Sequence, residues 1–139
     1  MSKIAVVYWS GTGNTESMAE AITKGARSAG AEVDVLSVGD ASVDKLKGYD
    51  KLAFGCPSMG DEVLEESEFE PFFADVEGSI SGIKVALFGS YGWGDGQWMR
   101  DWQKRTEDNG AQVFEEGFIQ NDAPDEALCE EFGARFAAF

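Results

Sequence analysis

Short apolar runs alternate with longer segments of helical period along this chain, and this alternation constrains the fold more than any other feature. Most of the runs are almost continuously apolar, as parallel strands covered on both faces are. Repeated strand–helix units of this kind predict an α/β fold with one open parallel sheet. The runs are Ile4–Tyr8, Val33–Val38, Leu52–Cys56, Val85–Gly89 and Gln112–Ile119.

The segments between these runs carry apolar stripes at helical spacing. Met18, Ile22 and Ala26 predict a helix that ends near Gly30. Further stripes start at Phe69, Trp98 and Leu128, and the stretch Val43–Leu46 indicates one short helix. The chain of 139 residues has no internal repeat or linker, so we expect a single domain over 1–139.

The charge balance is strongly acidic, with 26 acidic against 11 basic residues and a formal net charge of −15. A nucleic acid or an anionic membrane is therefore a poor partner, because both attract clustered Lys and Arg. A partner with a basic face, bound transiently, fits this charge, although the acidic residues could also serve solubility alone.

Several site chemistries are excluded by composition. The chain has no histidine, which removes imidazole bases and Cys-His or Ser-His-Asp nucleophiles. Its two cysteines, Cys56 and Cys129, form no CxxC pair, and we expect both to be buried. We predict no metal ligands and no catalytic residues. The first residues enter a strand directly and no apolar stretch reaches the ~20 residues of a membrane span, so we expect a cytoplasmic protein.

The segment after the first strand, Trp9–Thr15, is rich in glycine and hydroxyl side chains and precedes a helix. Helix N-termini reached through glycines bind anions with their N–H groups. A P-loop would need a lysine after the second glycine, and a dinucleotide loop would need a third glycine. The remaining interpretations are an ordinary turn or, because so many loop-type residues occur together, a site for one phosphate monoester.

Two more unusual loops follow the third and fourth apolar runs, Cys56–Glu62 and Gly89–Gly96. Ligands in open α/β sheets bind at this carboxyl edge. Trp93 lies between two glycines, where it could stack on a planar ligand or cover the end of the sheet. Met59 could contact the opposite face of that ligand or fill the core. With the phosphate loop, these residues favour a flat aromatic ligand that carries a phosphate.

Three blocks of the sequence, Ser10–Thr15, Met59–Phe72 and Phe88–Trp102, resemble the short-chain flavodoxins of anaerobic, clostridial-like bacteria. The resemblance implies a three-layer fold with a five-stranded parallel sheet in the order 2-1-3-4-5. It also implies non-covalently bound FMN that cycles between semiquinone and hydroquinone. The expected function is that of a monomeric, low-potential one-electron carrier between reductases and acceptor enzymes.

The resemblance further assigns the cofactor contacts residue by residue. The phosphate would be held by one loop and the ring would lie between Trp93 on its outer face and Met59 on its inner face. In a turn Met59–Glu62, Gly60 can adopt positive φ and Asp61 tolerates it, so the peptide between them can flip. The resemblance implies that this flip turns the Gly60 carbonyl toward the ring. Pro57 departs from relatives that have serine there and removes one hydroxyl. The expected FMN-binding residues are Ser10, Gly11, Thr12, Gly13, Asn14 and Thr15 for the phosphate, Ser90 beside the phosphate and ribityl chain, Asp61, Glu62 and Gly92 for the pyrimidine edge, and Ser58, Met59, Gly60, Tyr91 and Trp93 around the remainder.

Two alternatives remain on the same fold. An FMN-dependent quinone or nitro reductase would need a substrate pocket that nothing in the sequence provides. A flavin-free binding or signalling module would be colourless after incubation with FMN.

Overall fold

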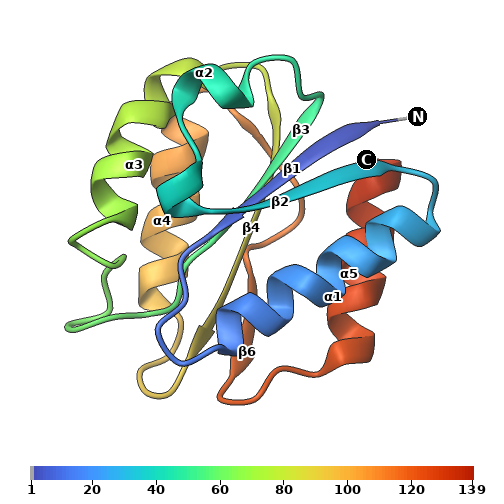
Figure 1. Cartoon of the computed structure of the whole chain (residues 1–139). Coiled ribbons are helices and arrows are strands. Elements are labelled where there is room, and N and C mark those ends of the chain that lie inside the picture. Colours follow the sequence, from blue (N-terminus) through green and yellow to red (C-terminus); the bar gives the residue numbers. More distant parts are fainter. Residues whose placement is uncertain (1) are drawn as a thin grey trace.

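The computed structural model describes residues 2–139, which form a parallel sheet between two layers of helices (Figure 1). The sheet has the strand order β2-β1-β3-β4-β5, with β6 also paired to β4, which confirms the predicted order. The elements are β1 (Lys3–Tyr8), α1 (Asn14–Ser28), β2 (Glu32–Ser37), α2 (Val43–Leu46), β3 (Lys51–Gly55), α3 (Phe69–Val76), β4 (Lys84–Tyr91), α4 (Gln97–Asp108), β5 (Gln112–Val113), β6 (Phe118–Asn121) and α5 (Glu126–Ala138), with 3-10 turns at Val38–Asp40 and Glu77–Ser79. No helix within residues 2–139 is long and apolar enough to cross a membrane.

Both faces of the sheet are buried, which explains why its strands read as continuous apolar runs. Along β1, Ala5 and Val7 belong to the core under α2, α3 and α4, whereas Ile4 and Val6 belong to the core under α1 and α5. Figure 1 shows α1 and α5 together on one side of the sheet and α3 and α4 on the other. Because successive side chains of a strand point to opposite faces, the same run of residues contributes to two separate cores.

The fifth strand differs from its prediction. The run Gln112–Ile119 does not form one continuous strand; β5 and β6 pair separately with β4. Between them Glu115 adopts a left-handed backbone with φ 51°, which interrupts the ladder. Phe114 is buried against Phe132 of α5, with ring centroids 5.4 Å apart. This packing lies at the break between β5 and β6. The apolar pattern of the sequence alone does not predict that break.

Helices α1 and α5 cross in direct backbone contact. A Cβ added at Gly25 would lie 1.9 Å from the carbonyl oxygen of Glu130, and one at Gly133 would lie 2.0 Å from that of Ile22. Each glycine therefore makes room for the backbone of the other helix.

Lysines from two strands hold the carboxyl end of α5. Lys51 is buried, and its Nζ donates to the carbonyl oxygens of Phe136 at 3.0 Å and Ala137 at 2.8 Å. Lys84 Nζ donates to the carbonyl oxygen of Phe139 at 2.7 Å. Burial lowers the pKa of Lys51. These donors bind carbonyl groups at the end of α5, where the last turn leaves carbonyls without helical partners. The carbonyl of Phe136 also accepts the N–H of Phe139 at 3.1 Å.

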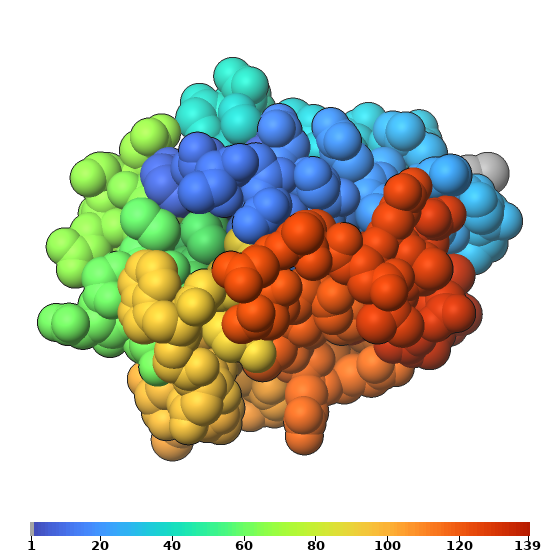
Figure 2. Space-filling model, turned by 90° about the horizontal axis from the view of Figure 1, so that it is seen from below, coloured from blue at the N-terminus to red at the C-terminus, as the bar shows by residue number. Residues whose placement is uncertain are grey.

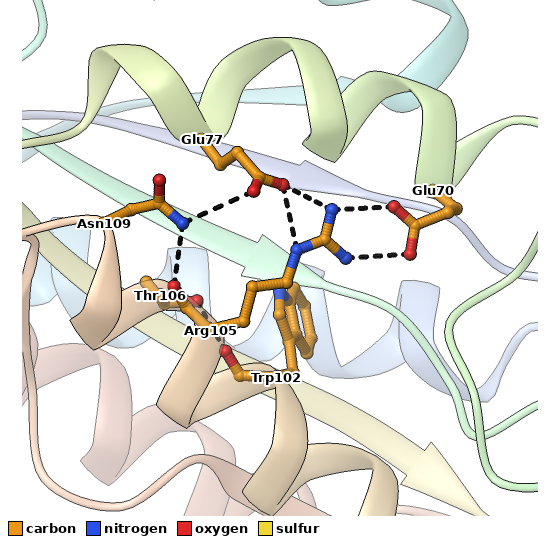
Figure 3. Close-up of polar contacts among 6 residues, drawn as sticks. All are labelled: Glu70, Glu77, Trp102, Arg105, Thr106 and Asn109. Atoms are coloured by element: carbon orange, nitrogen blue, oxygen red, sulfur yellow. Dashed lines mark hydrogen bonds and ion pairs between the residues drawn. The ribbon is translucent and has the colours of Figure 1, made fainter.

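An ion-pair network joins α3 to α4 (Figure 3). Arg105 donates to both carboxylate oxygens of Glu70, at 2.8 and 2.7 Å, and from Nε to Glu77 at 2.9 Å. Its guanidinium lies 5.0 Å from the ring centre of Phe73, and Asn109 donates to Glu77. The bond to Glu70 is the largest cause of a raised Arg105 pKa. A bidentate, partly buried pair of this kind holds the two helices at a fixed spacing.

Candidate functional site

Four connecting segments meet at the carboxyl edge of the sheet and enclose a cleft of about 360 Å³. Figure 2 shows this edge end-on, where segments coloured blue, green, gold and orange-red lie beside one another. A volume of this size suits a small organic ligand. The cleft is lined by Trp9, Gly11, Thr12, Asn14, Pro57, Ser58, Met59, Ser90, Tyr91, Gly92, Trp93 and Asp122.

The loop Ser10–Gly13 leads from β1 into α1. Ser10 Oγ accepts a hydrogen bond from the N–H of Gly13 at 3.1 Å, which closes the loop on itself. Gly13 has φ +97°, a left-handed conformation that glycine adopts without penalty. Helix α1 starts at Asn14, and its first N–H groups have no partner inside the helix. The predicted loop therefore presents a helix N-terminus to the cleft, as an anion site requires.

Three buried hydroxyls lie beneath this loop and come from three different segments. Thr15 Oγ1 lies 2.8 Å from Ser90 Oγ, and the N–H of Ser58 donates to the carbonyl oxygen of Ser90 at 3.0 Å. Ser58 is 4% exposed, and its Oγ has no hydrogen-bond partner among the described residues. A buried hydroxyl without a partner costs free energy unless a ligand supplies one. Since Ser58 also lines the cleft, its hydroxyl is available to a bound ligand.

The segment after β3 forms a tight hairpin. The N–H of Met59 donates to the carbonyl of Val63 at 2.9 Å, and the reciprocal bond has the same length. The turn thus closes at Val63, one residue later than the expected turn Met59–Glu62. Gly60 has φ +50° and Glu62 has φ +56°. Positive φ at Gly60 agrees with the expected turn chemistry, whereas the second left-handed residue is Glu62 instead of Asp61.

The hairpin and the loop after β4 contribute the predicted flanking side chains. Met59 is half-buried, whereas Trp93 is 56% exposed at the edge of the cleft. Tyr91 lies under this loop with its ring centre 5.6 Å from that of buried Trp98. Gly92 lines the cleft with its backbone, while Gly60, Asp61 and Glu62 lie outside the set of lining residues. The carboxylate of Glu62 instead accepts the N–H of Gln97 at the start of α4.

Two lining residues, Trp9 and Asp122, were missed by the sequence analysis. Trp9 lies over the glycine loop, because a Cβ added at Gly11 would come within 3.0 Å of its ring. Its Nε1 donates to Glu68 at 3.4 Å. Asp122 has φ 52°, and its N–H donates to the carbonyl of Tyr91 at 2.8 Å. The position of Trp9, directly before the glycine loop, could have indicated that it lines the cleft. No sequence signal indicated Asp122, because it reaches the cleft from the connection between β6 and α5.

A buried carboxylate anchors the chain where it leaves the hairpin. Glu65 is 7% exposed and accepts the N–H groups of Ser67, Glu68 and Phe69 at 2.9, 2.7 and 2.9 Å. Burial raises the pKa of Glu65, but these hydrogen bonds outweigh it, so the net pKa lies below the ordinary value. Glu65 therefore stays ionised at neutral pH and fixes the start of α3.

The two cysteines are buried, as predicted, and neither forms a disulfide. Burial raises the pKa of both thiols, that of Cys129 to about 11. Thiols of this kind are protonated at neutral pH and unreactive. Residues 2–139 contain no group of three or more acidic or cysteine side chains that could hold a metal ion.

Comparison with known proteins gives matches along nearly the whole chain. The family model described as Flavodoxin matches residues 6–133. The chain is 55% identical over 134 residues to a flavodoxin of Clostridium beijerinckii, with 95% of this chain and 97% of that protein covered. It is 49% identical over 131 residues to a flavodoxin of Megasphaera elsdenii, with 94% and 95% covered.

Solved structures agree with these sequence matches. The solution structure of two-electron reduced Megasphaera elsdenii flavodoxin superposes with a TM-score of 0.91 at 47% identity, covering 98% of this chain and 99% of that one. A flavodoxin from the domain Archaea gives a TM-score of 0.88 at 29% identity, with 98% and 96% covered.

Proposed function

Because the chain belongs to the flavodoxin family, whose members carry electrons on bound FMN, we propose that it transfers single electrons at low potential between reductases and acceptor enzymes. The proposal places it in the cytoplasm as a monomer, with one domain over residues 1–139. The observation that supports the site most directly is the unpaired, buried hydroxyl of Ser58 beside the Thr15–Ser90 pair in the cleft.

The residues of the cleft fit FMN. The hydroxyls and amides of Ser10–Thr15 would hold the phosphate at the start of α1, with Ser58 and Ser90 as further donors. Met59 and Trp93 would flank the ring, and Asp61, Glu62, Tyr91 and Gly92 would lie along its edge. When bound, FMN supplies one-electron chemistry that no side chain of the protein provides.

The charge of the cleft supports a low potential. Among residues 2–139, no lysine or arginine lines the cleft or the neighbouring hollow beside the glycine loop. The phosphate would therefore be held by neutral donors and keep its negative charge. Two unit charges about 10 Å apart at an effective dielectric of about 20 repel by about 1.7 kcal/mol, or about 70 mV for one electron. Acidic side chains at the rim add repulsion of the same sign and so disfavour further negative charge in the cleft.

The hairpin offers a backbone acceptor beside the cleft that could change its orientation. Gly60 has no atom within 4 Å of the position that a Cβ would occupy, and its left-handed backbone carries little strain. Its peptide can therefore turn its carbonyl oxygen toward the cleft and accept a proton donor there. An alanine at this position would adopt the same conformation at a cost of about 1 kcal/mol.

The rim of the cleft fits a partner with a basic face and a small apolar centre. Trp93 and Val63 are 56% and 40% exposed, and the exposed carboxylates of Asp61 and Glu66 lie in the hairpin and in the segment that follows it. The net charge of −15 attracts a basic partner from a distance. A small contact of this type favours rapid encounter and release over tight binding.

Binding measurements with FMN and riboflavin test the site. We expect the chain without flavin to bind FMN at least tenfold more tightly than riboflavin, because only FMN engages the phosphate loop. Ser58→Ala should weaken FMN binding about tenfold, whereas Ser79→Ala, at an exposed position away from the cleft, should leave it unchanged. Equal affinity for the two flavins would contradict the assigned phosphate site.

A further inference from the structure

Glu62 connects two segments of the cleft that are far apart in sequence. Its Oε2 accepts the N–H of Gln97 at 2.8 Å and that of Trp98 at 3.4 Å. These are the first two residues of α4, whose N–H groups have no partner inside the helix. The preceding Gly96 offers no side-chain cap, and the first turn of α4 contains no acidic residue. Glu62 therefore caps α4 from the hairpin that follows β3.

The backbone at Gly94 and the backbone at Glu62 both permit this contact. A Cβ added at Gly94 would lie 1.9 Å from Oε1 of Glu62 and 2.3 Å from its Cδ. Gly94 thus leaves the space that the carboxylate fills. Glu62 has φ +56°, which is uncommon for a residue with a side chain. Such a conformation persists where its surroundings stabilise it, and the bonds to α4 provide that stabilisation.

Trp98 closes a ring of contacts around the hairpin. Its indole Nε1 donates to the carbonyl of Cys56 at 3.2 Å, while its backbone N–H faces Glu62. The buried Trp98 thus contacts the chain at Cys56, before the hairpin, and at Glu62, within its turn. Two points of this segment are therefore fixed to the start of α4.

We propose that Glu62, Gly94 and the first two amides of α4 form a clasp that positions the two flavin-contacting loops relative to each other. Met59 belongs to one clasped loop and Trp93 to the other, so the clasp sets the spacing of the two side chains that flank the cleft. Both bonds to α4 are accepted by Oε2, and Oε1 takes no part in them. The consequence for FMN rests on the proposed function, whereas the clasp itself does not.

Amide hydrogen exchange, measured by NMR on the chain without flavin, tests the clasp directly. We expect Glu62→Ala to accelerate exchange at Gln97 and Trp98 about tenfold, and Glu62→Gln, which keeps one acceptor oxygen, to have a smaller effect. Gly94→Ala should produce the same acceleration, because its Cβ displaces the carboxylate. Unchanged exchange at both amides in Glu62→Ala would overturn the proposal, whether or not the chain binds FMN.

FMN affinity then separates positioning from a direct effect of charge. Gly94→Ala keeps the carboxylate yet breaks the clasp, so we expect its FMN Kd to rise about tenfold, as in Glu62→Ala. Gly82→Ala is the matched control, since Gly82 has φ +78° against +82° for Gly94 but open space around its Cβ. Glu66→Gln controls for the loss of one exposed charge in the same segment. A Kd within twofold of wild type in Gly94→Ala, with a large rise in Glu62→Ala, would show that Glu62 acts on the ligand alone.

Discussion

Replacing Glu65 by glutamine tests how the chain is anchored where it leaves the hairpin. The carboxylate is almost fully buried and accepts three backbone N–H groups, those of Ser67, Glu68 and Phe69. Glutamine keeps one acceptor oxygen but turns an N–H₂ group toward N–H donors. Loss of a cap costs about 1 kcal/mol, and loss of hydrogen bonds to a charged group costs more. We therefore expect Glu65→Gln to lower the free energy of unfolding by about 2 kcal/mol at pH 7.

The pH dependence distinguishes this charge effect from a packing effect. The hydrogen bonds hold the pKa of folded Glu65 below its ordinary value of 4.5. A carboxyl group with a lowered folded pKa contributes stability that is complete above the unfolded pKa and is lost as the pH falls through the folded pKa. The stability difference between wild type and Glu65→Gln should therefore be full at pH 7 and shrink progressively below about pH 4.5.

Urea unfolding of the chain without flavin, followed by far-UV circular dichroism, measures this difference. Flavin must be absent because bound FMN adds stability by mass action. In thermal unfolding of a chain of 139 residues, a loss of 2 kcal/mol in the free energy of unfolding corresponds to a fall in Tm of about 7 °C. The exposed neighbour provides a control, since Glu66→Gln should change stability by less than about 0.5 kcal/mol. Equal losses in the two variants, or a difference undiminished at pH 3, would refute the cap.

Gly133→Ala should destabilise the chain by about 2 kcal/mol or more in the same unfolding assay, because its Cβ would lie 2.0 Å from the carbonyl oxygen of Ile22; a loss below 0.5 kcal/mol would contradict the close helix crossing. Lys51→Met should cost about 1–2 kcal/mol and raise exchange in the last turn of α5, since the carbonyl of Ala137 loses its donor and that of Phe136 keeps only the N–H of Phe139. Unchanged exchange there would argue against this cap. Gly60→Ala should move the first one-electron potential of the FMN form by about 40 mV in a redox titration, and an unmoved potential would exclude a role for its left-handed backbone. Electron transfer to a basic redox protein should slow steeply as salt is raised in stopped-flow experiments, whereas a rate independent of salt would contradict steering by the acidic surface.

The sheet and its helices could be predicted because local pattern and tertiary environment agree. Runs such as Ile4–Tyr8 are apolar at every position since each face of the sheet has its own core. The fifth strand is the exception. Its break at Phe114–Gly117 coincides with the packing of Phe114 against α5, which is a contact between residues from different elements. The periodicity of one segment cannot predict such a contact.

The position of the cleft could be predicted from the sequence, but the contacts between its loops could not. Glycine loops at the carboxyl edge of a parallel sheet indicate where a ligand binds, and Trp93 and Met59 lie at the cleft as expected. The bonds from Glu62 to α4 and the position of Asp122 depend on how loops meet in space. Neither follows from spacing along the chain. The contacts between individual residues and FMN stay a prediction.

Stepwise reduction of the FMN-loaded protein with dithionite, followed by visible absorption, tests one-electron transfer most directly. We predict two resolved one-electron steps, with a long-wavelength band at about 580 nm that rises in the first step and disappears in the second. Direct bleaching in a single two-electron step, with no such band at any stage, would contradict the proposed function.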